Sequence, residues 1–133
     1  MKKYFIMLSC IAALSLCGCS KESSKVKEII TNAKTWSALV KDYPFLSNFP
    51  EFHGDIENVQ YREIGGSLKT VTFFDYACKE SVATTYFSSF APAGFNKSEN
   101  ADIYRKSNGD LEYIFTGGYA AGSFALSFSE NKN

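Results

Sequence analysis

The chain has 133 residues, with 14 Lys and Arg against 14 Asp and Glu, and 45% of its residues are hydrophobic. This charge balance argues against a nucleic-acid binder, which needs a basic surface to neutralise phosphates. The hydrophobic content argues against a disordered chain, because disordered chains are poor in such residues. The length suits one small domain with a single modest core.

The first 18 residues have the order of a secretory signal peptide. Lys2 and Lys3 form a basic start, and the 13 residues of Tyr4–Leu16 form an apolar run. A helix that spans a bilayer needs about 20 residues. The run is therefore too short for a permanent anchor and fits the apolar part of a signal peptide. We expect residues 1–18 to be removed, and the loss of the two lysines leaves 12 basic against 14 acidic residues.

The sequence Leu16-Cys17-Gly18-Cys19 resembles the lipobox of bacterial lipoproteins. An aliphatic residue stands at −3, a small residue at −1 and a cysteine at +1, whereas Cys17 at −2 departs from the usual Ala, Ser or Thr. The resemblance implies cleavage before Cys19, a diacylglyceryl thioether on its sulfur and an acyl group on the new amino terminus. It also implies a lipid-anchored protein of the cell envelope, on the outer membrane where a cell has two membranes and on the cell membrane otherwise. The alternative is an ordinary secreted protein cut by the general signal peptidase.

The cysteine count agrees with this interpretation. Cys10 and Cys17 leave with the signal peptide and Cys19 is lipidated, so Cys78 remains alone and no intramolecular disulfide is expected. One cysteine and one histidine cannot form a Cys/His zinc site. The sequence therefore predicts no cofactor besides the lipid on Cys19. The lipid bilayer is the one partner implied directly, and nucleic acid is not expected as a partner.

Residues 19–24 form a short polar tether, and residues 25–130 form a single domain. Apolar residues recur at steps of three and four from Val26 to Val40, which predicts an amphipathic helix that begins at Lys25 and ends near Asp42. The following loop, 43–53, contains two prolines and several aromatic residues. We expect this loop to fold back over the core as a lid.

The rest of the chain predicts mostly strands. Gly65-Gly66 and Asn108-Gly109 are strong hairpin signals, because tight turns need residues with positive φ. A second helix is expected over 78–90, with Val82, Tyr86 and Phe90 on its buried side. Glycines 117, 118 and 122 predict a turn. The expected strands are 56–64, 68–75, 103–107, 111–116 and 123–129.

These elements predict an α+β fold in the order αββαβββ. The sheet should be antiparallel, with about five strands, and two helices should cover one of its faces to make two layers. The segment from Ile56 to the last strands, with Tyr86 in its helix and Gly94-Phe95 after it, also resembles small uncharacterised lipoprotein domains of ββαββ type. That resemblance implies a fold and no particular chemistry.

No catalytic residue is predicted. His53 is the only histidine, and the chain has no Gly-x-Ser-x-Gly nucleophile motif. The glycines at 117–122 lack the Lys-Ser/Thr that ends a phosphate-binding loop. We therefore expect a non-enzymatic binding module for a protein or an envelope component. The alternatives are a small hydrolase of envelope material that uses His53 with nearby carboxylates, and a purely structural surface lipoprotein.

Aromatic residues make up 16% of the chain. Large rings can build a core in a small domain that has no disulfide, or they can form an exposed surface for a protein or glycan partner. Both interpretations remain open from the sequence. The candidates for a binding surface are Tyr43, Phe45, Phe49, Phe52, Tyr104 and Tyr119.

Overall fold

The computed structural model describes residues 26–31 and 35–133, the first of these ranges by its backbone only. The predicted signal peptide at 1–18, the lipidation site Cys19 and the tether at 20–24 lie outside the described residues.

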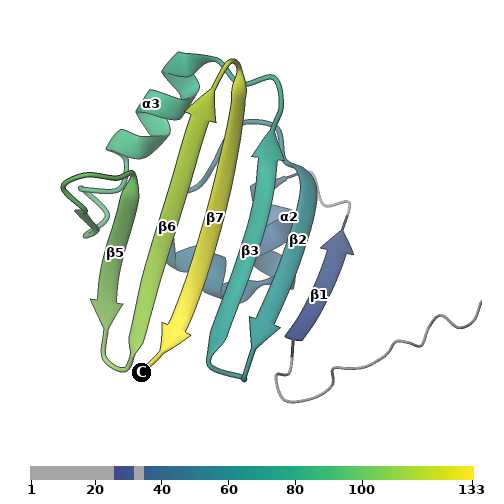
Figure 1. Ribbon diagram of the computed structural model, residues 1–133, viewed down its shortest axis with the longest axis vertical. Coiled ribbons are helices and arrows are strands. Elements are labelled where there is room, and N and C mark those ends of the chain that lie inside the picture. Colours follow the sequence, from purple (N-terminus) through teal and green to yellow (C-terminus); the bar gives the residue numbers. More distant parts are fainter. Residues whose placement is uncertain (1–25, 32–34) are drawn as a thin grey trace, which may run out of the picture.

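The described residues form one antiparallel sheet with two α-helices and a short 3₁₀ helix (Figure 1). The strands lie in the spatial order β1-β2-β3-β7-β6-β5-β4. The elements along the chain are β1 (Val26–Thr31), α2 (Trp36–Asp42), η3 (Pro44–Asn48), β2 (Glu57–Ile64), β3 (Leu68–Asp75), α3 (Glu80–Ser88), β4 (Asn96–Lys97), β5 (Ile103–Asn108), β6 (Leu111–Ala120) and β7 (Ser123–Lys132). The predicted α+β class with an antiparallel sheet and two helices is confirmed, but the sheet has seven strands instead of about five.

The prediction of one helix from Lys25 to Asp42 is wrong in its first half. Residues Val26–Thr31 form β1, which pairs antiparallel with β2. This segment is rich in β-branched residues, which favour strands. The helix begins only at Trp36, where the Thr35 hydroxyl accepts a hydrogen bond from the Ala38 amide at 3.2 Å and caps the first turn. The order αββαβββ therefore misses an edge strand at its start.

Both hairpin predictions are confirmed. Gly65 and Gly66 have φ of 62° and 74° in the turn between β2 and β3, and Gly109 has φ of 64° in the turn between β5 and β6. Residues with a β-carbon rarely adopt such angles. The turn expected at glycines 117, 118 and 122 is confirmed at Gly122 and wrong at the other two, because β6 continues to Ala120 and the chain reverses at Ala121 and Gly122.

Gly117 lies in the middle of β6 because there is no room for a side chain above it. A β-carbon added there would lie 2.8 Å from Phe87 Cε1 and 2.9 Å from Phe115 Cζ, whereas one added at Gly118 would meet nothing within 4 Å. The ring of Phe87, a residue of α3, thus packs directly on the backbone of β6. The glycine is needed for close packing and not for a turn.

We expect Gly117→Ala to lower the free energy of unfolding by about 1–3 kcal/mol, since the added methyl group overpacks the core. Gly118→Ala is the matched control and should be neutral or slightly stabilising, because alanine restricts the unfolded chain more than glycine does. Urea unfolding followed by circular dichroism measures both. Equal effects at the two positions would contradict this account of Gly117.

One side of the sheet carries an aromatic core. Phe128 of β7 lies at its centre, with its ring centroid 5.4 Å from that of Trp36 in α2, 6.5 Å from Tyr86 in α3 and 5.5 Å from Phe73 in β3. Side chains from both helices therefore reach one phenylalanine of the central strand. In Figure 1, α2 lies behind the sheet and α3 lies near the end at which β6 finishes.

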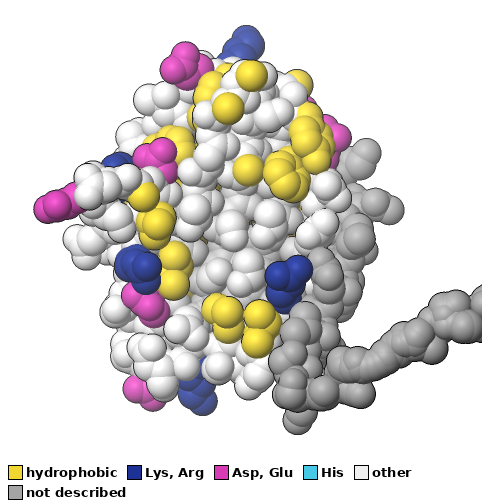
Figure 2. Space-filling model, in the orientation of Figure 1, with side chains coloured by type: hydrophobic (Ala, Val, Ile, Leu, Met, Phe, Trp, Pro, Cys, Tyr) yellow, Lys and Arg dark blue, Asp and Glu magenta, His cyan; other side chains and the backbone are white. Residues whose placement is uncertain are grey.

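The other side of the central strands is polar. Thr70 and Thr72 of β3 lie beside Ser129 and Ser127 of β7, at 3.0 and 3.5 Å between their hydroxyl oxygens. Figure 2 presents the face turned away from α2, and most of it is neither hydrophobic nor charged. Strands β3 and β7 alternate between this polar face and the buried aromatic one, as the sequence pattern predicts.

Candidate functional site

The segment from Phe49 to Gly54, named the strap here, crosses the aromatic side of the sheet. Phe49 and Phe52 are buried, and the Phe52 ring contacts Phe73 and Tyr86 with centroids 5.7 and 5.2 Å away. The expectation that this loop forms a lid over the core is therefore confirmed. Phe45, which lies in η3 just before the strap, is buried as well.

The proposed aromatic binding surface is wrong for four of its six residues. The side chains of Phe45, Phe49, Phe52 and Tyr104 are buried in the core, so they form no open surface for a partner, although Phe52 contributes to the lining of a pocket. Tyr43 and Tyr119 are partly buried; Tyr43 stacks on Tyr61, and Tyr119 donates a hydrogen bond to the Cys78 carbonyl at 2.9 Å. The six rings stabilise the fold and do not gather into one patch.

A surface pocket of about 480 Å³ lies between the strap and α3. Binding pockets for small molecules measure roughly 300–1,000 Å³, so its size is sufficient for one. Its apolar lining comes from Pro50, Phe52, Val82 and Tyr86, and its polar lining from Glu51, His53, Ser81, Thr85 and Ser89. A second hollow of about 290 Å³ lies beside α2 and shares Glu51, Phe52 and His53 with the first.

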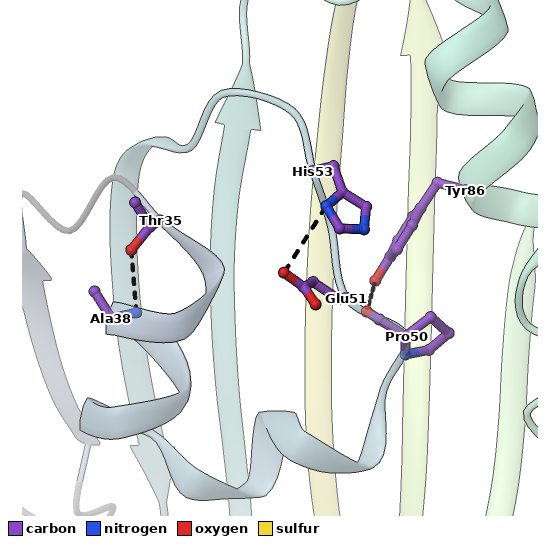
Figure 3. A network of polar contacts seen from close by, with 6 residues as sticks. All are labelled: Thr35, Ala38, Pro50, Glu51, His53 and Tyr86. Carbon is purple, nitrogen blue, oxygen red and sulfur yellow. Dashed lines mark hydrogen bonds and ion pairs between the residues drawn. The ribbon is translucent and has the colours of Figure 1, made fainter.

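Hydrogen bonds hold the strap near both of its ends, and Figure 3 shows the one at Pro50. The buried Tyr86 hydroxyl of α3 donates to the Pro50 carbonyl at 2.7 Å. Burial raises the pKa of this phenol, which keeps it protonated as a donor. At the other end, the carboxylate of buried Asp75 accepts hydrogen bonds from the amides of Asp55 and Ala77 at 3.2 and 3.1 Å. The pocket wall is therefore preorganised.

His53 and Glu51 form the rim of the pocket (Figure 3). His53 Nδ1 lies 3.8 Å from Glu51 Oε2, and the two side chains are 79% and 59% exposed. The single histidine thus has an acidic neighbour, as the hydrolase alternative requires. The exposure of both groups leaves them in water, where an ion pair contributes little.

Cys78, the only cysteine among the described residues, is buried beneath the start of α3. Its sulfur donates to the Lys79 carbonyl at 3.3 Å, and its amide donates to the Gly122 carbonyl at 2.8 Å. Burial, and next the charge of Asp75, raise the pKa of the thiol from 9.0 to about 11. A protonated and buried thiol is a poor nucleophile. Cys78 therefore serves packing at this site.

This thiol makes the stability depend on pH in the alkaline range. Between about pH 9 and 11 the folded chain keeps the Cys78 proton and the unfolded chain releases it, so the free energy of unfolding falls as pH rises. A tenfold change in proton affinity corresponds to about 1.4 kcal/mol, so the loss should be on the order of 2 kcal/mol. Urea unfolding at pH 8.5 and 10.5 measures it. The loss should be smaller in Cys78→Ala, and an equal loss in both proteins would contradict this assignment.

The sequence did not indicate two exposed residues in the part of the chain that runs from the end of β3 into α3. Val82, expected on the buried side of its helix, is 36% exposed at the pocket, because Ala83, Tyr86 and Phe90 occupy the side that faces the core. Tyr76 is 49% exposed; its ring stacks on Phe74, and its hydroxyl accepts a hydrogen bond from the Asn58 amide at 3.2 Å. A helical periodicity identifies the apolar face of a helix, but it does not say how much of that face the rest of the protein buries.

In the described ranges 26–31 and 35–133, no three side chains of His, Cys, Asp or Glu are placed to bind a metal ion together. No helix within these same ranges has both the length and the apolar character that crossing a bilayer requires. No protein-family model, no curated protein sequence and no solved structure matches this chain.

Proposed function

We propose that this chain is a non-enzymatic binding module of the cell envelope, anchored by lipid at Cys19, which binds a protein or another envelope component. The sequence Leu16-Cys17-Gly18-Cys19 supports the anchor. The preorganised pocket between the strap and α3 supports binding, and it is the observation that carries the proposal.

The anchor would place this pocket away from the membrane. β1 begins at Val26, which pairs with Ile64 beside the turn at Gly65. Six residues separate Val26 from Cys19, a reach of roughly 20 Å when extended. This end of the sheet would therefore face the lipid. The strap and the start of α3 belong to the opposite end, where Asp75 pairs with Phe124.

We also infer a two-layer arrangement, in which both helices cover the aromatic side of the sheet. Its support is that Trp36 of α2 and Tyr86 of α3 both contact Phe128. The polar face of Thr70, Thr72 and their serine neighbours then stays uncovered.

Ser20 follows the cysteine in place of Asp, which is compatible with sorting to an outer membrane where there is one. In a cell with one membrane the anchor would lie in the cell membrane.

The binding proposal is tested by affinity capture from native envelopes. The full-length chain carries a carboxy-terminal tag and is crosslinked in cells before purification. Thr85→Trp fills the pocket from its exposed rim, and Ser107→Trp places the same ring on an exposed site of β5 as the matched control. An envelope component retrieved by the wild type and by Ser107→Trp, and lost with Thr85→Trp, would support the proposal. Equal retrieval by all three chains would contradict it.

The second candidate is a small hydrolase of envelope material. The observation that favours it is the 3.8 Å approach of His53 to Glu51 at a pocket that also contains the Ser81 hydroxyl. His53→Gln separates the two candidates. It would abolish the release of soluble fragments from purified envelopes if the chain is a hydrolase, whereas a chain that only binds would release no such fragments with or without His53.

A further inference from the structure

The pocket beside α3 combines an apolar interior with a single formal charge. Val82 is one of two large hydrophobic side chains that are markedly exposed in the described part of the chain, and it lies in the pocket lining with Phe52 and Tyr86. When a ligand covers exposed apolar area of this kind, the removal of that area from water favours binding. The interior of the pocket therefore suits an apolar group of a ligand, such as a ring system.

The charge of the pocket is acidic. Glu51 carries the only formal charge of the lining when histidine is neutral, and neither Lys nor Arg contributes to this pocket or to the adjoining hollow. The Glu51 carboxylate lies between the two hollows and is more than half exposed, so that a ligand can approach it from either side. Its neighbour His53 is more exposed still, so the imidazole does not cover the carboxylate from water.

The polar groups next to the apolar lining can accept hydrogen bonds from a ligand. The hydroxyls of Ser81 and Thr85, on the exposed side of α3, have no hydrogen-bond partner within the described residues. An ammonium group has three donors and no acceptor. A carboxylate with hydroxyls at the edge of an apolar pocket therefore complements a ligand with an amine.

We propose that this pocket binds a small organic amine, with its ring system against Val82, Phe52 and Tyr86 and its ammonium group at the Glu51 carboxylate. This inference rests on the proposed binding function and names the chemical class of the ligand. An anionic ligand of the same shape would meet the like charge of Glu51 and bind more weakly. The preference for a cation should be modest, because the carboxylate is exposed to water and to salt.

Three indole compounds of one shape test the charge preference: tryptamine, which is cationic, tryptophol, which is neutral, and indole-3-acetate, which is anionic. Binding is measured by equilibrium dialysis against the full-length chain as cells process it, in nanodiscs where it carries lipid, with protein-free samples as blanks. We expect tryptamine to bind two- to fivefold more tightly than tryptophol at low salt, and indole-3-acetate to bind most weakly. Glu51→Gln should reduce the ratio of tryptamine to tryptophol affinity to about one.

Two further variants make the outcome specific. Glu99→Gln removes an exposed carboxylate outside the pocket and should keep the wild-type ratio. Thr85→Trp should weaken the binding of all three compounds at least fivefold. The inference is overturned if the wild type binds none of the compounds at millimolar concentration, if it shows no charge preference, or if Glu99→Gln lowers the ratio as much as Glu51→Gln does. None of these outcomes affects lipidation of Cys19 or capture of an envelope protein, which are measured separately.

Discussion

Replacement of Phe128 by alanine should lower the free energy of unfolding by about 3–5 kcal/mol, the usual cost of deleting a buried phenylalanine. The Phe128 side chain has no exposed area, and its ring contacts Trp36, Phe73, Tyr86 and Phe115. Its removal leaves a cavity beneath both helices and the strap. Since small domains are stable by only about 5–15 kcal/mol, this loss would remove a large share of the total stability.

The control for Phe128→Ala is Phe74→Ala. Phe74 is only partly buried, and among the described residues its ring contacts only that of the exposed Tyr76. Its replacement should cost about 1 kcal/mol. Urea unfolding measures both, and Phe128→Leu provides a milder variant if Phe128→Ala does not fold. If Phe128→Ala and Phe74→Ala destabilise the protein equally, the core is not centred on β7 as the structure has it.

Local signals account for the parts of the fold that the sequence predicted well. Gly65-Gly66 and Asn108-Gly109 specify turns through their own backbone preferences, and the alternation of Phe124, Leu126 and Phe128 specifies which side of β7 is buried. These features need no knowledge of distant residues. β2 ends at Ile64 and β3 begins at Leu68, on either side of the predicted turn, and β7 begins at Ser123, all as predicted.

The errors arise where distant parts of the chain decide the structure. The apolar residues of Val26–Thr31 suit one side of a helix as well as a strand, and only pairing with β2 selects the strand. In the sequence, Gly117 looks like a turn residue. Only the packing of Phe87 against it explains why a glycine lies within a strand. Phe52 and His53 of the candidate site were named from the sequence, but the pocket itself was not, because Glu51 and Val82 are 31 positions apart and come together only when the strap lies against α3. The abundance of phenylalanine and tyrosine indicated many contacts without distinguishing core from surface.

If Cys19 carries the lipid as proposed above, its replacement by alanine should abolish both lipidation and the cleavage before residue 19, which is the largest effect expected of any single substitution. Each buried methylene of an acyl chain contributes about 0.8 kcal/mol, and stable anchoring takes two or more chains. Alanine has no sulfur to carry the first of them, and lipobox cleavage follows that step. Only an unlabelled precursor that keeps residues 1–18 should remain.

The neighbouring Cys17 supplies the matched control, because alanine is common at position −2 of a lipobox. Cys17→Ala should incorporate alkyne-tagged palmitate and be cleaved like the wild type, whereas Cys19→Ala should take up no label and keep the mass of the precursor. Intact-mass spectrometry and flotation of membranes on a density gradient measure the two results. If Cys19→Ala is labelled and cleaved like the wild type, the anchor is not at this residue. If Cys17→Ala alone loses the label, the lipidated cysteine lies two positions earlier, and the tether to β1 is longer by the same two residues.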